Sequence, residues 1–149
     1  KTKYSDPPSN ANAAKLAVQS AMFQWFHDTV AGDYKEISKR YHFPLVYYKK
    51  NRNMSREEFE QMMKEEFEKW KERSADVGYN MVGDSTDSKR FVVLLNFRFN
   101  YFSTTSIFGC SMNKLIFEWR RGEYLITNHE EMIEYEKQYP KNCNKNNAF

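Results

Sequence analysis

The sequence is poor in several residue types, and each shortage excludes a class of protein. Five glycines and four prolines in 149 residues argue against a disordered chain. No apolar run is long enough to cross a membrane, and no stretch has the pattern of a signal peptide. No set of His, Asp and Glu residues has metal-ligand spacing, so the sequence predicts neither a metal site nor a cofactor.

Charge and cysteine are scarce as well. The formal net charge is only +3, with 23 basic and 20 acidic residues, and these are interspersed. A nucleic-acid-binding surface needs a basic stripe, so nucleic acid is not expected as a partner. The two cysteines, Cys110 in a predicted strand and Cys143 in a polar tail, fit neither a metal site nor a redox motif. The sequence favours one buried thiol and one thiol in the tail, and it leaves the redox state of the two cysteines open.

The length suits one domain with one hydrophobic core. Residues 1–11 are expected to be a linker, residues 12–139 a single domain and residues 140–149 a disordered tail. The chain begins at Lys1 instead of Met, which indicates a processed protein or an excised domain. A secreted or periplasmic location is compatible with this start, and the compartment stays open.

Aromatic residues, in contrast, are abundant: 12 Phe, 10 Tyr and 3 Trp make up 17% of the chain. Rings in such number usually fill a core or line a cavity. In residues 90–102 every second residue from Phe91 to Tyr101 is apolar, while the other parity turns polar at Asn96. This pattern predicts a long strand inside a sheet, with one apolar face and one mixed face.

The part of the chain before residue 74 is mainly helical in pattern. The first helix has an apolar stripe that includes Leu16 and Phe23, and Gly32 supplies its left-handed stop. Ser55 and Glu58 have capping-box spacing, which predicts the start of the third helix. Helices are expected at residues 12–31, from Asp33 to a short distance before Pro44, which disfavours helix at Phe43, and from residue 56, with a short strand at residues 45–49.

After the third helix the hydrophobic period changes to two. Antiparallel pairing of residues 90–102 with residues 108–120 is expected to place Phe97 opposite Asn113 and Phe91 opposite Trp119. This register gives one continuous apolar face. Further strands are expected at residues 76–82 and 124–128, and a helical turn or two at residues 129–140.

This order of elements resembles the nuclear transport factor 2-like (NTF2-like) superfamily, which includes ketosteroid isomerase and SnoaL. The resemblance is carried by FQWFHDTVAGDYKEISKRYHFPLVYY and by the hairpin FEWRRGEYLI, and it spans residues 12–128. It implies an α+β cone fold, in which three N-terminal helices pack on a curved, mostly antiparallel sheet. It also implies a conical, aromatic-lined pocket and, as in many members, dimerisation through the outer face of the sheet.

The resemblance does not extend to the residues that carry isomerase chemistry. Isomerase-type members place a carboxylate base on or next to the first strand, which here reads LVYYKKN. Tyr47 and Tyr48 occupy this region, and a tyrosine, with an ordinary pKa of about 10, is a poor base at neutral pH. The missing carboxylate argues against isomerase or dehydratase chemistry, and no catalytic residue is assigned.

Candidate ligand-binding residues lie on the predicted apolar face, on the first helix and on the first strand. Ser111 and Asn113 end the apolar face, and polar groups in such a place suggest a pocket mouth as readily as a satisfied core. His27 has the chemistry of an acid or base near neutral pH, or is a surface or packed histidine. The candidates are Trp25, His27, Tyr47, Phe97, Phe99, Tyr101, Ser111 and Asn113.

The opposite face of the sheet mixes apolar and charged residues. This composition is that of a moderately polar protein interface, although an antiparallel sheet can also face solvent on one side. Many members of the superfamily that this chain resembles dimerise through this face, which favours a homodimer. The expected interface residues are Val92, Leu94, Arg98, Met112 and Ile116.

Three functions are open at this point. The first is a non-catalytic domain that binds a small apolar or amphipathic ligand, or a peptide or glycan segment, in an aromatic-lined pocket, as a homodimer or accessory module. The second is a SnoaL-type or isomerase-type enzyme that uses His27 or a tyrosine as its acid-base group. The third is a protein-interaction scaffold whose cone is filled. An open cavity favours the first, and a titratable group pointing into that cavity is required by the second.

Overall fold

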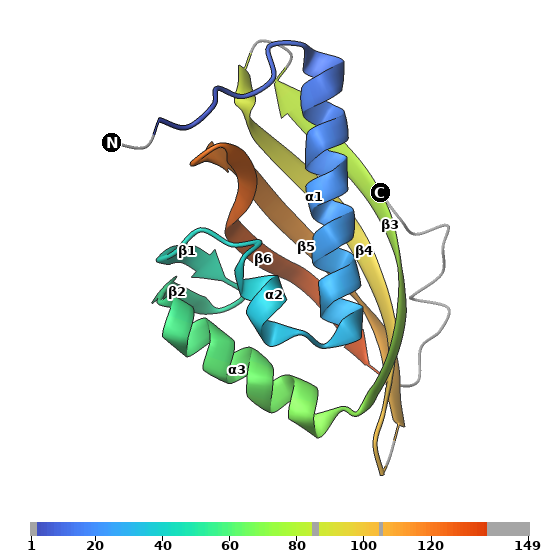
Figure 1. Cartoon of the computed structure of the whole chain (residues 1–149). Coiled ribbons are helices and arrows are strands. Elements are labelled where there is room, and N and C mark those ends of the chain that lie inside the picture. Colours follow the sequence, from blue (N-terminus) through green and yellow to red (C-terminus); the bar gives the residue numbers. More distant parts are fainter. Residues whose placement is uncertain (1–2, 85–86, 105, 137–149) are drawn as a thin grey trace.

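Three helices and six strands make up the part of the chain that the computed structural model describes, which is residues 3–84, 87–104 and 106–136 (Figure 1). The helices are α1 (Ala11–Ala31), α2 (Tyr34–Ser38) and α3 (Arg56–Lys69). The strands are β1 (Leu45–Tyr48), β2 (Asn51–Met54), β3 (Glu72–Asp84), β4 (Asp87–Phe102), β5 (Ser106–Arg120) and β6 (Glu123–Glu136).

Local capping chemistry sets the helix ends, as the sequence predicts. The Asn10 side chain accepts hydrogen bonds from two backbone N–H groups in the first turn of α1. Gly32 ends α1 in the left-handed conformation, at φ 75°. Ser55 and Glu58 form the expected capping box at the start of α3.

The buried face of α1 differs from the predicted apolar stripe. Leu16 is 64% exposed and Phe23 is 42% exposed, so these two members of that stripe do not belong to the core. The side that packs against the sheet begins with small residues, which allow the helix to approach closely. The buried residues on this side are Ala14, Val18, Met22, Trp25 and Thr29.

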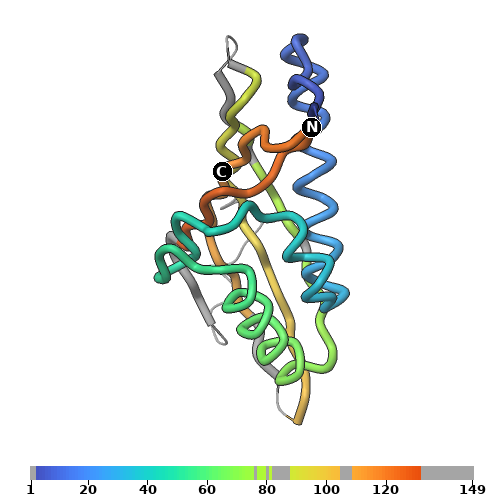
Figure 2. Tube along the Cα trace, turned by 60° about the vertical axis from the view of Figure 1, so that its left-hand side comes forward, coloured from blue at the N-terminus to red at the C-terminus, as the bar shows by residue number. Residues whose placement is uncertain are grey.

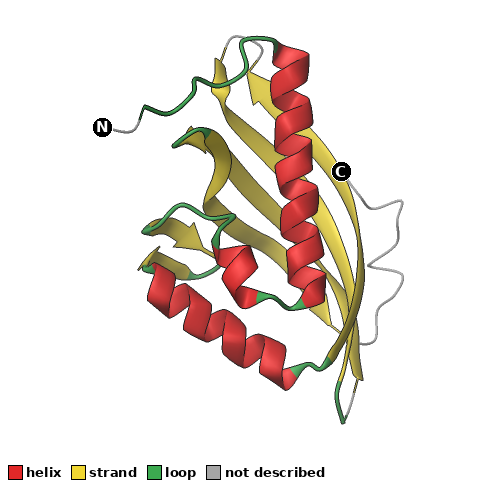
Figure 3. Ribbon diagram, in the orientation of Figure 1, coloured by secondary structure: helices red, strands yellow, loops and turns green. Residues whose placement is uncertain are grey.

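The six strands form one sheet in the order β2-β1-β6-β5-β4-β3. All neighbours are antiparallel except β1 and β6, which are parallel. The three helices lie on one face of this curved sheet (Figure 3). In Figure 2 the molecule is turned so that the side with α3 and the β1–β2 hairpin comes toward the viewer. The predicted class, an α+β cone with three helices on a curved and mostly antiparallel sheet, is confirmed.

The β4–β5 register differs from the prediction by two residues. Phe97 faces Ser111 and Phe91 faces Phe117, because β5 begins at Ser106, closer to the end of β4 than predicted, and the connecting loop is shorter. A shift of two residues leaves each side chain on its predicted face, since side chains alternate with a period of two.

β6 is much longer than predicted. Residues 129–136 continue the strand, where a helical turn was expected. They pair with β5 along its length, as far as Gly109 opposite Glu136. The ladder satisfies backbone groups that a short helix would leave unpaired at both ends. Residues 137–140 of the expected turn lie outside the described residues.

The predicted free thiol at Cys110 is wrong. Cys110 is disulfide-bonded and 0% exposed. Spacing along the sequence says little about which cysteines meet in space, so this disulfide could not be predicted from the sequence. Cys143 lies outside the described residues.

The hydrophobic core lies between the helices and the inner face of the sheet. Phe91, Val93 and Leu95 of β4 and Leu115 and Phe117 of β5 belong to it. The inner face turns polar toward the other end of β5, and this is where the candidate site lies. None of the helices in the described part of the chain combines the length and apolarity that crossing a membrane requires.

Candidate functional site

A cavity of about 570 Å³ lies between the inner face of the sheet and the helices α1 and α3. Aromatic residues form much of its wall and α3 supplies methionines, while five charged residues also line it: Lys49, Glu66, Lys69, Arg73 and Glu131. The aromatic lining residues are Trp25, Tyr41, Tyr48, Phe67, Trp70, Phe97, Phe99 and Tyr101.

A continuous row of hydrogen bonds crosses the floor of this cavity, and we call it the polar chain. Trp25 Nε1 donates to the Tyr41 hydroxyl oxygen at 2.9 Å. That hydroxyl lies 2.9 Å from His129 Nδ1, and His129 Nε2 lies 2.9 Å from Asn113 Oδ1. Asn113 Nδ2 donates to Ser111 Oγ at 2.8 Å. The five residues are between 1% and 6% exposed, so the polar chain is buried.

The titratable groups of the cavity floor are uncharged near neutral pH. Burial lowers the pKa of His129 well below its ordinary value, and the charge of Lys49 acts in the same direction. Burial raises the pKa of Tyr41 and of Tyr48, and it raises the pKa of Tyr101 to about 12. Proton exchange with a ligand at neutral pH is therefore unfavourable at each of these groups.

A β-bulge brings His129 into the cavity. Phe117 of β5 pairs with Ile126 of β6, and the adjacent residue of β5, Ile116, pairs with Asn128. Thr127 is therefore an extra residue in β6. One extra residue exchanges the two faces of everything that follows it. Without this bulge, His129 would lie on the outer face of the sheet.

Tyr41 reaches the polar chain because the segment after α2 is tied to β6. His42 N donates to Ile126 O at 2.9 Å, and Ile126 N donates to Arg40 O at 2.8 Å. Between these two bonds the Tyr41 ring turns inward and stacks with the His129 ring, with 6.2 Å between centroids. Tyr41 and His129, which are 88 positions apart in the sequence, are joined in this way.

Charged groups lie around the polar chain at the edge of the cavity. Lys49 and Glu131 form an ion pair at 3.3 Å. Arg73 donates to the carbonyls of Val30, Phe67 and Trp70, at or near the carboxyl ends of α1 and α3. A cation in this position stabilises the negative ends of both helices, which gives Arg73 a structural role.

Six of the eight candidate residues come together at the cavity. The structure places Trp25, Phe97, Phe99, Tyr101, Ser111 and Asn113 in its lining. Tyr47 does not line it, because β1 turns Tyr48 inward instead, and the Arg52 guanidinium lies over the Tyr47 ring.

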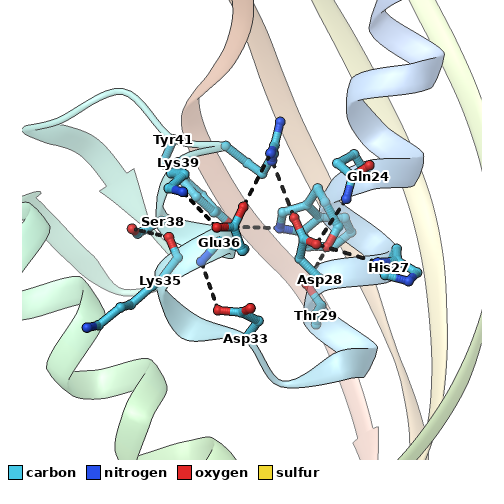
Figure 4. A network of polar contacts seen from close by, with 12 residues as sticks. Gln24, His27, Asp28, Thr29, Asp33, Lys35, Glu36, Ser38, Lys39 and Tyr41 are labelled. Carbon is cyan, nitrogen blue, oxygen red and sulfur yellow. Dashed lines mark hydrogen bonds and ion pairs between the residues drawn. The ribbon is translucent and has the colours of Figure 1, made fainter.

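His27, the other candidate outside the lining, lies on the outer side of α1, with its side chain 76% exposed. Figure 4 shows its ring beside Asp28, and Nδ1 lies 3.5 Å from Asp28 Oδ1. Asp28 itself is buried; it accepts from Gln24 Nε2 at 3.0 Å, and its Oδ2 lies 3.3 Å from Arg40 Nε. This ion pair joins α1 to the segment after α2. His27 is therefore a surface residue next to a structural network, outside the cavity.

Sequence reasoning missed several cavity residues, and Tyr41, Tyr48 and His129 are those among them that lie on the floor and beside it. Tyr41 and His129 lie at the ends of predicted elements and have no partner spacing in the sequence. The aromatic stretch around β1 pointed to this region, but it did not show which of two adjacent tyrosines turns inward. Within residues 3–84, 87–104 and 106–136, no group of three or more His, Cys, Asp or Glu side chains is placed to hold a metal ion.

No protein-family model matches the sequence, and no curated protein matches it. Solved structures do match. The Kfla4162 protein of Kribbella flavida superposes with a TM-score of 0.74 at 8% identity, over 87% of this chain and 96% of that one. A candidate dehydratase of the NTF2-like family from Streptomyces avermitilis gives a TM-score of 0.68 at 8% identity, over 80% and 95%. This chain has the NTF2-like fold.

Another protein that superposes on this NTF2-like fold is the hexachlorocyclohexane dehydrochlorinase LinA-type3 of Novosphingobium barchaimii. Its TM-score is 0.65 at 10% identity, over 85% of this chain and 93% of that one. At such low identity the likeness shows the fold alone, because one fold hosts many unrelated functions. Function has to be argued from the cavity.

Proposed function

We propose that the cavity binds a small, mostly apolar ligand and holds it without chemical conversion. The observation that carries this proposal is a cavity of about 570 Å³ with an aromatic wall and a floor of uncharged, mutually hydrogen-bonded groups. Pockets for small ligands span about 300–1,000 Å³ and have this composition, apolar with a few placed polar groups. The volume suits a small molecule better than a peptide or glycan segment.

The polar chain argues against the enzymatic alternative. That alternative requires a titratable group in the cavity, and His129 is such a group. Both of its ring nitrogens are already engaged, by Tyr41 and by Asn113, and burial lowers its pKa. A general base needs a free lone pair within reach of the substrate proton. Two carboxylates line the cavity as well: Glu131 is paired with Lys49, and Glu66 is an exposed residue of α3.

The scaffold alternative requires a filled cone. The lining side chains here leave space between α3 and the sheet, and this space supports the ligand-binding proposal over the scaffold.

Blocking the cavity from α3 tests the proposal. Met62 lines the cavity, whereas Lys64 lies on the exposed side of the same helix. We expect the amphipathic dye 1-anilinonaphthalene-8-sulfonate to bind the wild-type protein with a rise in its fluorescence. Met62→Trp should weaken dye binding about tenfold or more, since the indole fills the space that the dye needs. Lys64→Trp is the matched control and should leave binding unchanged.

Two results would contradict the proposal. One is a wild-type protein that binds no dye and is not stabilised against heat by any member of a library of small aromatic compounds. The other is equal loss of dye binding in both variants, which would place the dye on the surface of α3.

We also propose that the outer face of the sheet forms a homodimer. Val92, Leu94 and Met112 are partly exposed apolar residues on neighbouring strands, with Arg98 and Ile116 beside them, and partly exposed apolar side chains with charged neighbours are typical of such interfaces. Sedimentation equilibrium should give twice the chain mass of 17.9 kDa, and Leu94→Arg should give the monomer. A wild-type monomer at every concentration would contradict the dimer.

A further inference from the structure

We infer that the polar chain gives the cavity floor an excess of hydrogen-bond donors, so that it selects ligands with an uncharged acceptor oxygen, such as a ketone, ester or amide carbonyl. This inference rests on the proposed function, and it adds the chemistry of the ligand. It follows from the direction in which the five side chains of the polar chain hydrogen-bond.

Trp25 favours one direction, because an indole N–H donates and never accepts, and the Tyr41 hydroxyl then has its own hydrogen to give to another acceptor. The Tyr41 oxygen receives this hydrogen bond, so the Tyr41 hydrogen is free to turn toward His129 Nδ1, 2.9 Å away. A neutral imidazole carries one hydrogen. With Nδ1 accepting, that hydrogen lies on Nε2.

The second half of the polar chain continues in the same sense. His129 Nε2 donates to Asn113 Oδ1. The amide is thereby oriented with its NH₂ group toward Ser111, whose Oγ accepts one of the two amide hydrogens. From Trp25 through Tyr41 and His129 to Asn113, each side chain therefore donates a hydrogen bond to the next one. The direction is therefore set by residues from α1, the segment after α2, β6 and β5.

Two hydrogens remain at the end of the polar chain, one on the Ser111 hydroxyl and one on Asn113 Nδ2. No acceptor among the described residues takes either of them. Both side chains line the cavity and are almost completely buried, and a buried donor without an acceptor is costly. A carbonyl oxygen at this place satisfies the donors, while the aromatic wall covers the apolar part of the same ligand.

The acceptor is expected to be uncharged. Glu131 lies next to Asn113 on the neighbouring strand, so an anion at the cavity floor would meet a carboxylate. Of the three cations that line the cavity, Lys49 is already paired with Glu131, Arg73 is engaged by backbone carbonyls, and Lys69 is an exposed residue of α3. A buried carboxylate without its own cation pays a large desolvation cost.

A pair of isosteric ligands tests this inference directly. 2-Acetylnaphthalene and 2-isopropenylnaphthalene have nearly the same shape, and they differ by a carbonyl oxygen against a CH₂ group. We expect calorimetry to show the ketone binding the wild-type protein about tenfold more tightly, the factor that one neutral hydrogen bond supplies. 2-Naphthoate, the charged analogue, should bind more weakly than the ketone.

Trp25→Phe tests the origin of this preference. The substitution keeps an aromatic ring in the wall but removes the donor that favours this direction. The ketone preference should fall to about threefold or less, because Tyr41 and His129 can then also adopt the opposite orientation. Phe99→Leu is the control. It changes the wall and both affinities, while the ratio between the two ligands should stay at its wild-type value.

The possible failures are distinct. If neither naphthalene binds, the proposed function fails, and this inference fails with it. If both bind the wild-type protein equally well, ligand binding stands and the donor floor is refuted. Tighter binding of 2-naphthoate would overturn the requirement for an uncharged acceptor, and an unchanged ratio in Trp25→Phe would overturn the directional role of Trp25. The wild-type comparison needs no variant to fold.

Discussion

Tyr41→Phe is the perturbation that tests the polar chain most sharply as a structural unit. The Tyr41 hydroxyl joins Trp25 to His129, and both partners are buried. The ring packs against Phe59, with 4.6 Å between centroids, and phenylalanine preserves this packing. The substitution therefore isolates the hydroxyl.

The expected loss of stability follows from the groups left behind. Removing the hydroxyl leaves the Trp25 N–H without an acceptor and His129 Nδ1 without a donor. An unsatisfied buried polar group costs about 1–3 kcal/mol, and two such groups that relax in part give an expected loss of about 2–4 kcal/mol. This is a large share of the roughly 5–15 kcal/mol that stabilises a typical domain.

Urea unfolding followed by circular dichroism measures this loss as a shift of the midpoint at constant slope. Tyr47→Phe is the matched control, because Tyr47 is a neighbouring tyrosine whose hydroxyl has no hydrogen-bond partner in the described part of the chain. The control should change the free energy of unfolding by less than about 0.5 kcal/mol. Equal and small effects of the two substitutions would refute the assignment of Tyr41 as the link of the polar chain.

Two further predictions concern pH and the helix end. Burial lowers the folded-state pKa of His129, so as pH falls below about 6.5 the unfolded chain binds a proton first, and stability drops by up to about 1.4 kcal/mol per pH unit. His129→Gln should lose less stability than wild type between pH 7.5 and pH 5, and identical losses in urea midpoints would contradict a buried neutral imidazole. Gly32→Ala should destabilise by about 1–3 kcal/mol, because φ is +75° and the new Cβ would overlap the Arg73 guanidinium group. A midpoint within error of wild type would contradict the close approach of Arg73 to Gly32.

The elements that sequence reasoning predicted well are those governed by neighbours in the chain. The Ser55 capping box and the left-handed Gly32 depend on residues within a few positions, and the structure confirms both. The faces of β4 and β5 follow from strict alternation, so they were correct even though the register was shifted by two residues.

The cavity floor was harder to predict because it depends on long-range contacts. The extra residue at Thr127 reverses the face of His129, and nothing in the local pattern marks this bulge. Tyr41 and His129 meet only because β6 pairs with β1 and contacts the segment after α2. Ser111 and Asn113 were recognised as polar residues ending an apolar face, but their partners came from elements distant in sequence.

A crystal structure of the protein with 2-acetylnaphthalene tests the central claim most directly. The account predicts that the naphthalene ring lies in the cavity between Trp25 and the aromatic wall of β4. It also predicts that the ketone oxygen lies about 2.7–3.2 Å from Ser111 Oγ or Asn113 Nδ2. An empty cavity at saturating ligand, or a ligand whose carbonyl turns away from these two side chains, would contradict it.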